Sequence, residues 1–325
     1  MFFAQWQHVQ LSMQSTLEAF SLADGHPMGA VTMLPACTNP ISGPFRARDG
    51  AFWYVVSTGP RLRSDLAGGD PAPNSCSGTL IRLNPTTRTQ TVEWKAPASE
   101  LIDAPVPSPD GKEVAYLAGG CDTSYFNMHI EVRNLATGHE WAIGGSATPC
   151  HGLSEPSWSA DGSKLLFTFA PSVLSPNTTF VPHGGCEAPA PGELAIVPSN
   201  QPAEITAQDL TAASPGCGYQ YAVFDHEGIA ASEACGENDL GPAYLVQLDA
   251  HLVAITRVQL PSGGGTTLAA DPMGKFVLVD AHEGEQSKNG QEVGPYDWIE
   301  VFDGHQLRLI ARTNYFSSAI SWATF

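Results

Sequence analysis

One short phrase recurs along this chain: an apolar strand, a tight Asp-Gly turn, and a second apolar strand. It reads VPSPDGKEVAYLAG at 106–119, SWSADGSKLLFTF at 157–169 and FRARDGAFWYVVS at 45–57, with looser copies at 221–234 and 268–281. Asp-Gly supplies the positive φ of a tight turn between two strands, so each copy predicts a β-hairpin. Recurrence at intervals of tens of residues predicts a repeat architecture.

A second, more polar hairpin follows each Asp-Gly hairpin. Examples are HIEVRNLATGHEWAIG at 129–144 and WIEVFDGHQLRLIAR at 298–312. Two hairpins in series form a four-stranded antiparallel meander. Packing such meanders radially leaves only short, protected edges, which is the arrangement of a β-propeller. The less polar first hairpin is expected to lie nearest the central axis.

Five complete meanders can be counted, and the two chain ends supply a sixth. The segment 316–325 is expected to form its innermost strand, and residues 1–34 are expected to form the other three. The sequence therefore predicts an all-β fold, a single domain over 1–325. This domain is a six-bladed propeller of four-stranded blades, closed by pairing of the N- and C-terminal strands. Seven blades is the alternative, and it requires one more meander than the sequence provides.

The phrases PSWSADGSKLLFTF and PSPDGKEVAYL, each followed by an Ile-x-Val strand, resemble the TolB-like (WD40-like) propeller repeat. The resemblance covers about residues 40–325 and is strongest at 103–170. It implies the blade type. Repeats of this kind serve as scaffolds, as binding platforms and as accessory domains of peptidases, so the resemblance leaves the function open.

The charge balance excludes two classes of partner. The chain has 15 basic and 33 acidic residues, a formal net charge of −18. Nucleic acid and anionic membranes both require a cationic face, so neither is expected as a partner. No apolar run reaches the roughly 18 residues of a membrane span, so membrane insertion is not expected either. The start, MFFAQWQHVQLSMQ, lacks the features of a signal peptide, so an exported form would be a processed chain.

Seven cysteines lie in predicted loops beside Gly, Pro, Ser and Asn. Three precede an innermost strand and three follow the second strand of the same blade, where the connections emerge on one face. This predicts three disulfides, Cys37–Cys76, Cys150–Cys186 and Cys217–Cys235, with Cys121 as a free thiol. The rival pairing is Cys121–Cys150. Loop cysteines that recur in register indicate disulfides, so an extracytoplasmic location (periplasmic, secreted or cell-surface) is expected.

Motifs of catalysis and metal binding are absent from the sequence. It contains no Gly-x-Ser-x-Gly elbow, no His-Glu-x-x-His, no phosphate-binding loop and no dinucleotide fingerprint. The segment His282-Glu283-Gly284-Glu285 is interpreted as a solvated loop. No cofactor is therefore expected, with calcium as the one ion to consider.

The long, dissimilar loops all follow the second strand of a blade, whereas the Asp-Gly turns are short and uniform. Long loops on one face of a rigid scaffold commonly carry binding. Polar and aromatic residues near these loops form the candidate binding face: Asp122, Tyr125, Phe126, His183, Glu233, His282, Glu283 and Tyr296. The main prediction is a non-catalytic, monomeric binding module that presents a disulfide-braced loop face to a protein, peptide or glycan.

The alternative is a hydrolase or lactonase of the six-bladed kind, with a metal held at the channel mouth by carboxylates and an amide. The strand ends offer Asp280, Glu233 and Asp225, which do not form a recognisable ligand set. A third hypothesis is a sensory or scaffold domain from a larger, membrane-anchored protein.

Overall fold

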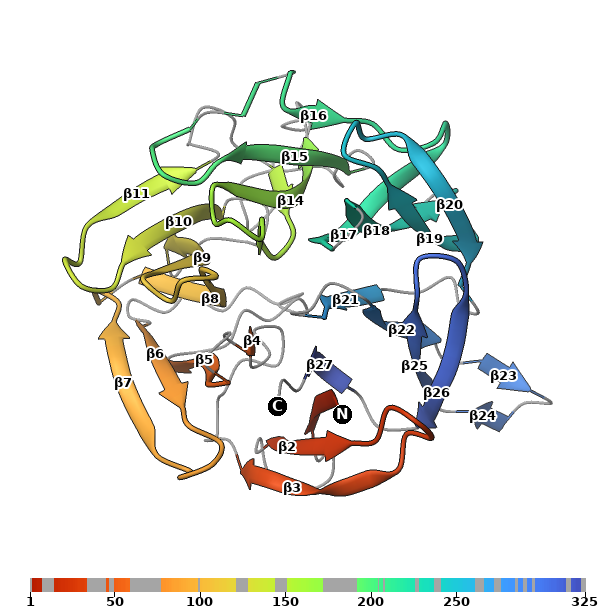
Figure 1. The fold of residues 1–325 in the computed structure, drawn as a ribbon, viewed down its shortest axis with the longest axis horizontal. Coiled ribbons are helices and arrows are strands. Elements are labelled where there is room, and N and C mark those ends of the chain that lie inside the picture. Colours follow the sequence, from red (N-terminus) through yellow and green to blue (C-terminus); the bar gives the residue numbers. More distant parts are fainter. Residues whose placement is uncertain are drawn as a thin grey trace, which may run out of the picture.

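The computed structural model of the chain is all-β. It describes residues 2–7, 15–33, 45–46, 50–58, 77–98, 100–120, 128–143, 151–171, 192–203, 205–206, 208–225, 228–236, 241–260, 266–271, 276–283, 286–288, 291–293, 296–313 and 317–322. Within these ranges every regular element is a strand, and no helix is present that could cross a membrane. The sheets stand around a common centre, which gives the molecule the form of a β-propeller (Figure 1).

The first sheet joins the two ends of the chain. Its order is β27 (Ser317–Trp322), β1 (Phe2–Gln7), β2 (Ser15–Phe20) and β3 (Pro27–Met33). β27 runs antiparallel to β1, with Phe2 opposite Trp322 and Ala4 opposite Ile320.

The next two groups of strands follow the chain in order. The first comprises β4 (Phe45–Arg46), β5 (Phe52–Thr58), β6 (Ser77–Leu83) and β7 (Gln90–Lys95). The second comprises β8 (Glu100–Pro107), β9 (Glu113–Gly120), β10 (His129–Asn134) and β11 (Glu140–Ile143). A single parallel pair, Ser77 and Glu100, connects the two groups into one eight-stranded sheet.

Three further sheets complete the circle. One has β12 (His151–Leu153) and β13 (Ser157–Trp158) beside β14 (Lys164–Pro171), then β15 (Glu193–Pro198) and β16 (Leu210–Thr211). The next is β17 (Cys217–Phe224), β18 (Ile229–Cys235), β19 (Ala243–Leu248) and β20 (Ala254–Gln259). The last is β21 (Thr266–Ala270), β22 (Val277–Glu283), β25 (Tyr296–Phe302) and β26 (Leu307–Thr313).

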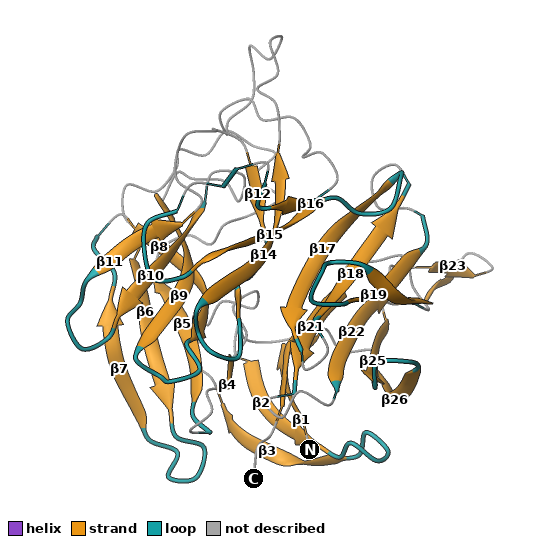
Figure 2. Cartoon of the chain, turned by 45° about the horizontal axis from the view of Figure 1, so that its top comes forward, coloured by secondary structure: helices purple, strands orange, loops and turns teal. Residues whose placement is uncertain are grey.

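A separate hairpin lies between β22 and β25, in one of the long segments that the sequence analysis expects to be a loop. β23 (Gln286–Lys288) pairs with β24 (Gln291–Val293), and the hairpin projects from the edge of the molecule beside β25 (Figure 2). The alternation of polar residues in this segment is short, so it gave no signal strong enough to predict strands.

The Asp-Gly turns are structural, as the sequence predicts. In one of them the Oδ1 atom of Asp110 accepts hydrogen bonds from Ser108 Oγ (2.8 Å) and Lys112 N (3.1 Å). Gly111 follows at a φ of +72°, in the left-handed region that favours glycine. Hydrogen bonds, chiefly from the backbone and side chain of Lys112, lower the pKa of Asp110 to about 2. The ionised Asp110 carboxylate thus stabilises the turn.

The core lies between neighbouring sheets. Successive side chains of a strand point to opposite faces, and β14 illustrates the consequence. Leu165 and Phe167 pack in a cluster with residues of β9 and β10, such as Leu117 and Ile130. Leu166, between them, packs in the next cluster with residues of β17 and β18. This two-sided burial explains why the innermost hairpins are apolar throughout and why each sheet is held by both of its neighbours.

Candidate functional site

Hydrogen bonds tie together the innermost strands of three successive sheets. The indole Nε1 of Trp158, in β13, donates to the carbonyl oxygen of Val106 in β8 at 2.9 Å. On its other side, β13 receives a bond from β17, because Phe224 N donates to Ser157 Oγ at 3.2 Å. These contacts link β8 and β17 to opposite sides of β13.

Three ionisable side chains lie three positions before these contacts, one from each sheet. They are Asp103 in β8, Glu155 two residues before β13, and Tyr221 in β17. Asp103 is fully buried, whereas Glu155 and Tyr221 keep a partial exposure. None of the three is among the predicted site residues, although both acids precede an Asp-Gly turn by a similar distance: Asp103 by seven residues and Glu155 by six.

The three groups are close enough to affect one another electrostatically. Burial, reinforced by the charge of Asp103, raises the pKa of Glu155 from 4.5 to about 8. Burial also raises the pKa of Tyr221, and the charges of Glu155 and Asp103 add to that increase. At neutral pH the Glu155 carboxyl is therefore mostly protonated and the Tyr221 hydroxyl keeps its proton.

An irregular backbone surrounds Asp103. Asp103 lies opposite Leu117 and Val106 lies opposite Ala115, so β8 carries one residue more than β9 between these pairs. Ala104, in this bulge, has a φ of +47°, and its N–H donates to Asp103 Oδ1 at 2.7 Å. Bulges and left-handed non-glycine residues often mark functional sites, because they redirect a side chain at a cost in backbone energy.

β17 has a comparable bulge next to Tyr221. Tyr219 pairs with Glu233 and Tyr221 pairs with Ser232, which leaves Gln220 as the additional residue. The carbonyl oxygen of Gln220 accepts a bond from Thr168 Oγ1 at 3.0 Å. Its side-chain Oε1 is buried and has no hydrogen-bond partner among the described residues. An unpaired amide oxygen thus lies in the residue beside Tyr221.

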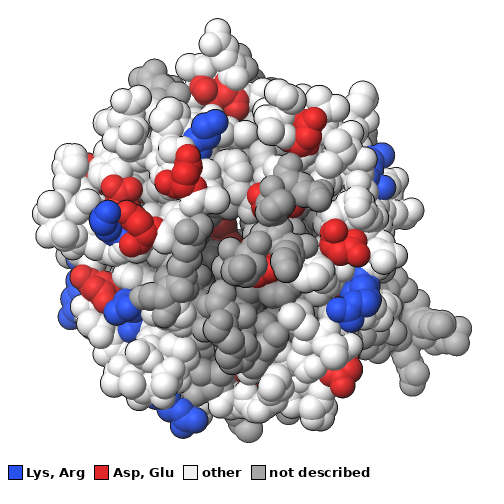
Figure 3. Space-filling view, in the orientation of Figure 1, with Lys and Arg blue, Asp and Glu red and all other residues white. Residues whose placement is uncertain are grey.

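The space-filling view down the axis shows a hollow near the middle of the molecule, with acidic atoms visible inside it (Figure 3). A carboxyl group with a pKa near neutrality is able to accept and return a proton. We call Asp103, Glu155 and Tyr221 the axial cluster.

Glu233, predicted as part of the binding face, has a structural role instead. Glu233 is 1% exposed, and both of its carboxylate oxygens have protein partners. Oε1 accepts a hydrogen bond from Ser214 N at 2.7 Å, and Oε2 accepts one from Arg257 Nε at 2.9 Å and forms an ion pair with Arg257 Nη2 at 2.8 Å. A buried carboxylate paired in this way is unavailable to a ligand.

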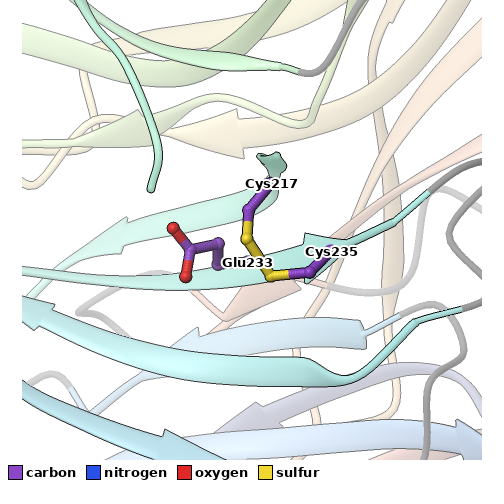
Figure 4. Close-up of side chains that lie close together, drawn as sticks. All are labelled: Cys217, Glu233 and Cys235. Carbon is purple, nitrogen blue, oxygen red and sulfur yellow. A yellow bond between two sulfur atoms is a disulfide. The ribbon is translucent and has the colours of Figure 1, made fainter. Parts of the chain in front are cut away.

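Cys217 and Cys235 form a disulfide beside Glu233, as predicted (Figure 4). These three residues are also the one group of metal-ligand type that the described part of the chain brings within 4.8 Å. The sulfurs are bonded to each other and Glu233 is paired with Arg257, so this group does not fit a metal ion.

The other predicted site residues divide into two groups. For His282, Glu283 and Tyr296 the structure gives backbone positions in β22 and β25, where Glu283 lies opposite Tyr296. The remaining members of the predicted face and the other cysteines lie outside the described residues: Asp122, Tyr125, Phe126, His183, Cys37, Cys76, Cys121, Cys150 and Cys186.

The acids proposed for the alternative metal site do not form a cluster. Asp225 accepts bonds from Gly228 N (2.8 Å) and Gln247 Nε2 (3.1 Å), which hold the β17–β18 turn. Asp280 is a buried residue of β22, in a different sheet. The acids that do come together, Asp103 and Glu155, come from β8 and the segment before β13.

Comparison with known proteins gives the fold. The sequence matches no protein-family model, and no curated protein is similar to it. Among solved structures it is similar to the periplasmic gluconolactonase PpgL of Pseudomonas aeruginosa, with 15% identity and a TM-score of 0.53 over 96% of this chain and 82% of that one. It is also similar to prolyl oligopeptidase B of Galerina marginata, with 12% identity and a TM-score of 0.54 over 97% of this chain and 41% of that one. An oligogalacturonate lyase in complex with manganese matches with 12% identity and a TM-score of 0.49, over 91% of this chain and 75% of that one.

These likenesses contradict the prediction of a non-catalytic binding module. The gluconolactonase and the prolyl oligopeptidase share the fold over nearly the whole of this chain and are both enzymes, and they accord better with the alternative of a hydrolase or lactonase propeller. At 15% identity or less, the likeness shows the fold alone. The chemistry has to be argued from the axial cluster.

Proposed function

We propose that this protein is a hydrolase of esters or lactones, with Glu155 as its general base and acid. The observation that carries the proposal is the placement of Glu155 beside Asp103, where burial and the charge of Asp103 raise the pKa of Glu155 to about 8. A general acid–base group works best when its pKa lies near the operating pH, and catalytic carboxyls reach this range through burial and like charge.

The proposed reaction needs only water as co-reactant. The ionised carboxylate of Glu155 removes a proton from a water molecule as its oxygen attacks the carbonyl carbon of the substrate. The protonated Glu155 then returns the proton to the departing alkoxide oxygen as the C–O bond breaks. Water and an ester thus give an acid and an alcohol, and Glu155 is restored. The hydroxyl of Tyr221, which keeps its proton, is placed to donate a hydrogen bond to the oxygen on which charge develops.

Asp103 is a positioning residue in this scheme. It is fully buried, its Oδ1 accepts a bond from Ala104 N, and its charge raises the pKa of Glu155. Removal of that charge lowers the pKa of Glu155, so the pH dependence of the reaction should move to lower pH.

The proposed substrate is neutral, such as a sugar lactone or a glycan ester. The acidic axial cluster and the net charge of −18 both disfavour an anionic substrate. Calcium is the ion to test, although the described residues fit it incompletely. Asp103, Glu155 and the amide oxygen of Gln220 offer oxygen atoms, but calcium prefers six to eight oxygen ligands and no further cluster of ligand type includes these residues. No step of the scheme depends on it.

The same proposal includes the finer architecture. Six groups of strands, with β27 beside β1, support a single domain over 1–325 in six blades closed by the two chain ends. The repeated Ser-x-Asp-Gly turns support the TolB-like blade type. The Cys217–Cys235 disulfide supports an extracytoplasmic location, and we propose that the protein is a monomer.

Hydrolysis of δ-gluconolactone and of p-nitrophenyl acetate, measured from pH 6 to 9 with and without calcium, tests the function. Glu155→Gln should lower kcat/KM by about 100-fold or more. Asp103→Asn should shift the pH profile to lower pH. Glu93→Gln, at an exposed position of β7, removes one negative charge as Glu155→Gln does and serves as the matched control. Activity on either substrate that survives Glu155→Gln unchanged would refute the assignment of the base.

A further inference from the structure

The disulfide between Cys217 and Cys235 lies against a cation. The two cysteines face each other across β17 and β18. Arg257, in β20, reaches over β19 so that its Nη2 lies 3.4 Å from Cys235 Sγ and 3.8 Å from Cys217 Sγ. A disulfide sulfur carries no charge, so the guanidinium gains little from this contact while the bond is intact.

The guanidinium is held in this position from two other sides. Glu233 Oε2 accepts a hydrogen bond from Arg257 Nε and forms an ion pair with Nη2, and the centroid of the Tyr244 ring lies 3.6 Å from the guanidinium carbon. Arg257 therefore does not have to move to meet a charge that forms on sulfur. A neighbouring arginine stabilises a thiolate and lowers the pKa of the thiol, which makes that sulfur a better leaving group.

We propose that Cys217–Cys235 is a thiol–disulfide exchange site, with a dithiol as its reaction partner. A thiolate of the partner attacks Cys217 Sγ, the bond to Cys235 Sγ breaks, and Cys235 leaves as a thiolate beside Arg257. The second thiol of the partner, after losing its proton, attacks the mixed disulfide and releases Cys217. The partner is oxidised by two electrons, the protein is reduced by two, and the two protons of the partner's thiols are taken up by the cysteines or the solvent.

The direction of attack follows from the two distances. Arg257 lies nearer to Cys235, so Cys235 is the better leaving thiolate and Cys217 is the sulfur attacked. The chain before Cys217 is open to a partner, because Pro215 and Gly216 form an exposed turn and Cys217 is itself partly exposed. Cys217 is the first residue of β17, the strand that carries Tyr221, so reduction releases a restraint on one strand of the axial cluster. The proposal does not depend on the hydrolase activity.

The test is equilibration of the full-length protein in glutathione and dithiothreitol redox buffers at pH 7.5. Free thiols are then alkylated, and mass spectrometry of the peptides with Cys217 and Cys235 gives the fraction reduced at this bond. Circular dichroism on the same samples reports whether the protein is folded. The bond should be reduced while the protein remains folded. Reduction that occurs only together with loss of the folded signal overturns the proposal.

A pair of variants measures the effect of the Arg257 guanidinium on reduction of the disulfide. Arg257→Gln alone leaves the buried Glu233 carboxylate without its partner, so the comparison is made in a background that lacks this charge. The disulfide should be harder to reduce in the double variant E233Q/R257Q than in E233Q. The expected difference is about tenfold in the exchange equilibrium constant, which equals about 30 mV for a two-electron couple. Equal constants, or a double variant that is easier to reduce, would overturn the role of Arg257.

Discussion

The raised pKa of Glu155 makes a prediction about stability that requires no substrate. Glu155 titrates near pH 4.5 in the unfolded chain and near 8 in the folded protein. Between these two values the unfolded state has released its proton and the folded state has not. The folded state thus binds more protons, and the free energy of unfolding must fall as the pH rises through this window.

The magnitude follows from the size of the difference. A pKa raised from 4.5 to about 8 corresponds to about 5 kcal/mol if the whole effect is expressed. Glu155 keeps some exposure, and solvent screening reduces the effect, so we expect about 2–4 kcal/mol. Glu155→Gln cannot ionise and should lose this dependence. The variant should match the wild type near pH 5 and exceed its free energy of unfolding by about 2–4 kcal/mol at pH 8.

Urea denaturation followed by tryptophan fluorescence, at half-unit steps from pH 5 to 8.5, measures the effect. The control is again Glu93→Gln, because it changes the net charge equally but lies exposed on β7. Glu93→Gln should follow the wild-type pH dependence. If Glu155→Gln also follows it, Glu155 has no raised pKa, and both this argument and the proposed proton transfer fail.

Two further predictions concern the scaffold around the axial cluster. Gly228→Ala should lower the free energy of unfolding by about 2 kcal/mol or more, because Gly228 has a φ of +152° and an added Cβ would lie 2.2 Å from Leu248 O. Thermal denaturation followed by circular dichroism measures the effect, and an unchanged midpoint would show that this close approach is unimportant. Trp158→Phe should lower the free energy of unfolding in urea by about 1–3 kcal/mol, because it removes the 2.9 Å hydrogen bond to Val106 O and leaves that carbonyl without its indole donor. A decrease below about 0.5 kcal/mol would contradict a role of this bond in joining β8 to β13.

Repetition made the general fold predictable from the sequence. The Asp-Gly phrase predicts its local structure directly, because the turn requires a left-handed glycine and the flanking residues are apolar enough for burial on both faces. Gly111 and Gly162 occupy such positions, with φ of +72° and +75°. The pairing of the chain ends could be anticipated because 316–325 resembles the start of an inner strand.

The candidate site could not be predicted in the same way, because an ionisable residue in an apolar strand has no local pattern to distinguish it. Asp103 and Glu155 are separated by 52 positions along the chain, and only the packing of successive sheets places them together. Glu233 shows the opposite error. It was selected from its place near a strand end, but its partner Arg257 lies on another strand, and only the structure reveals that the carboxylate is already bound.

The two bulges explain why a propeller can tolerate charge near its axis. A regular inner strand would place its side chains alternately against the two neighbouring sheets, where an acid would be buried without compensation. The extra residue in β8 changes this alternation at Asp103, and the left-handed turn of Ala104 brings a backbone N–H to the Asp103 carboxylate. The bulge at Gln220 breaks the alternation of β17 directly before Tyr221. Both irregularities occur beside the ionisable groups of one cluster, and the left-handed Ala104 costs backbone energy. We therefore interpret the bulges as the means by which the fold holds those groups in place.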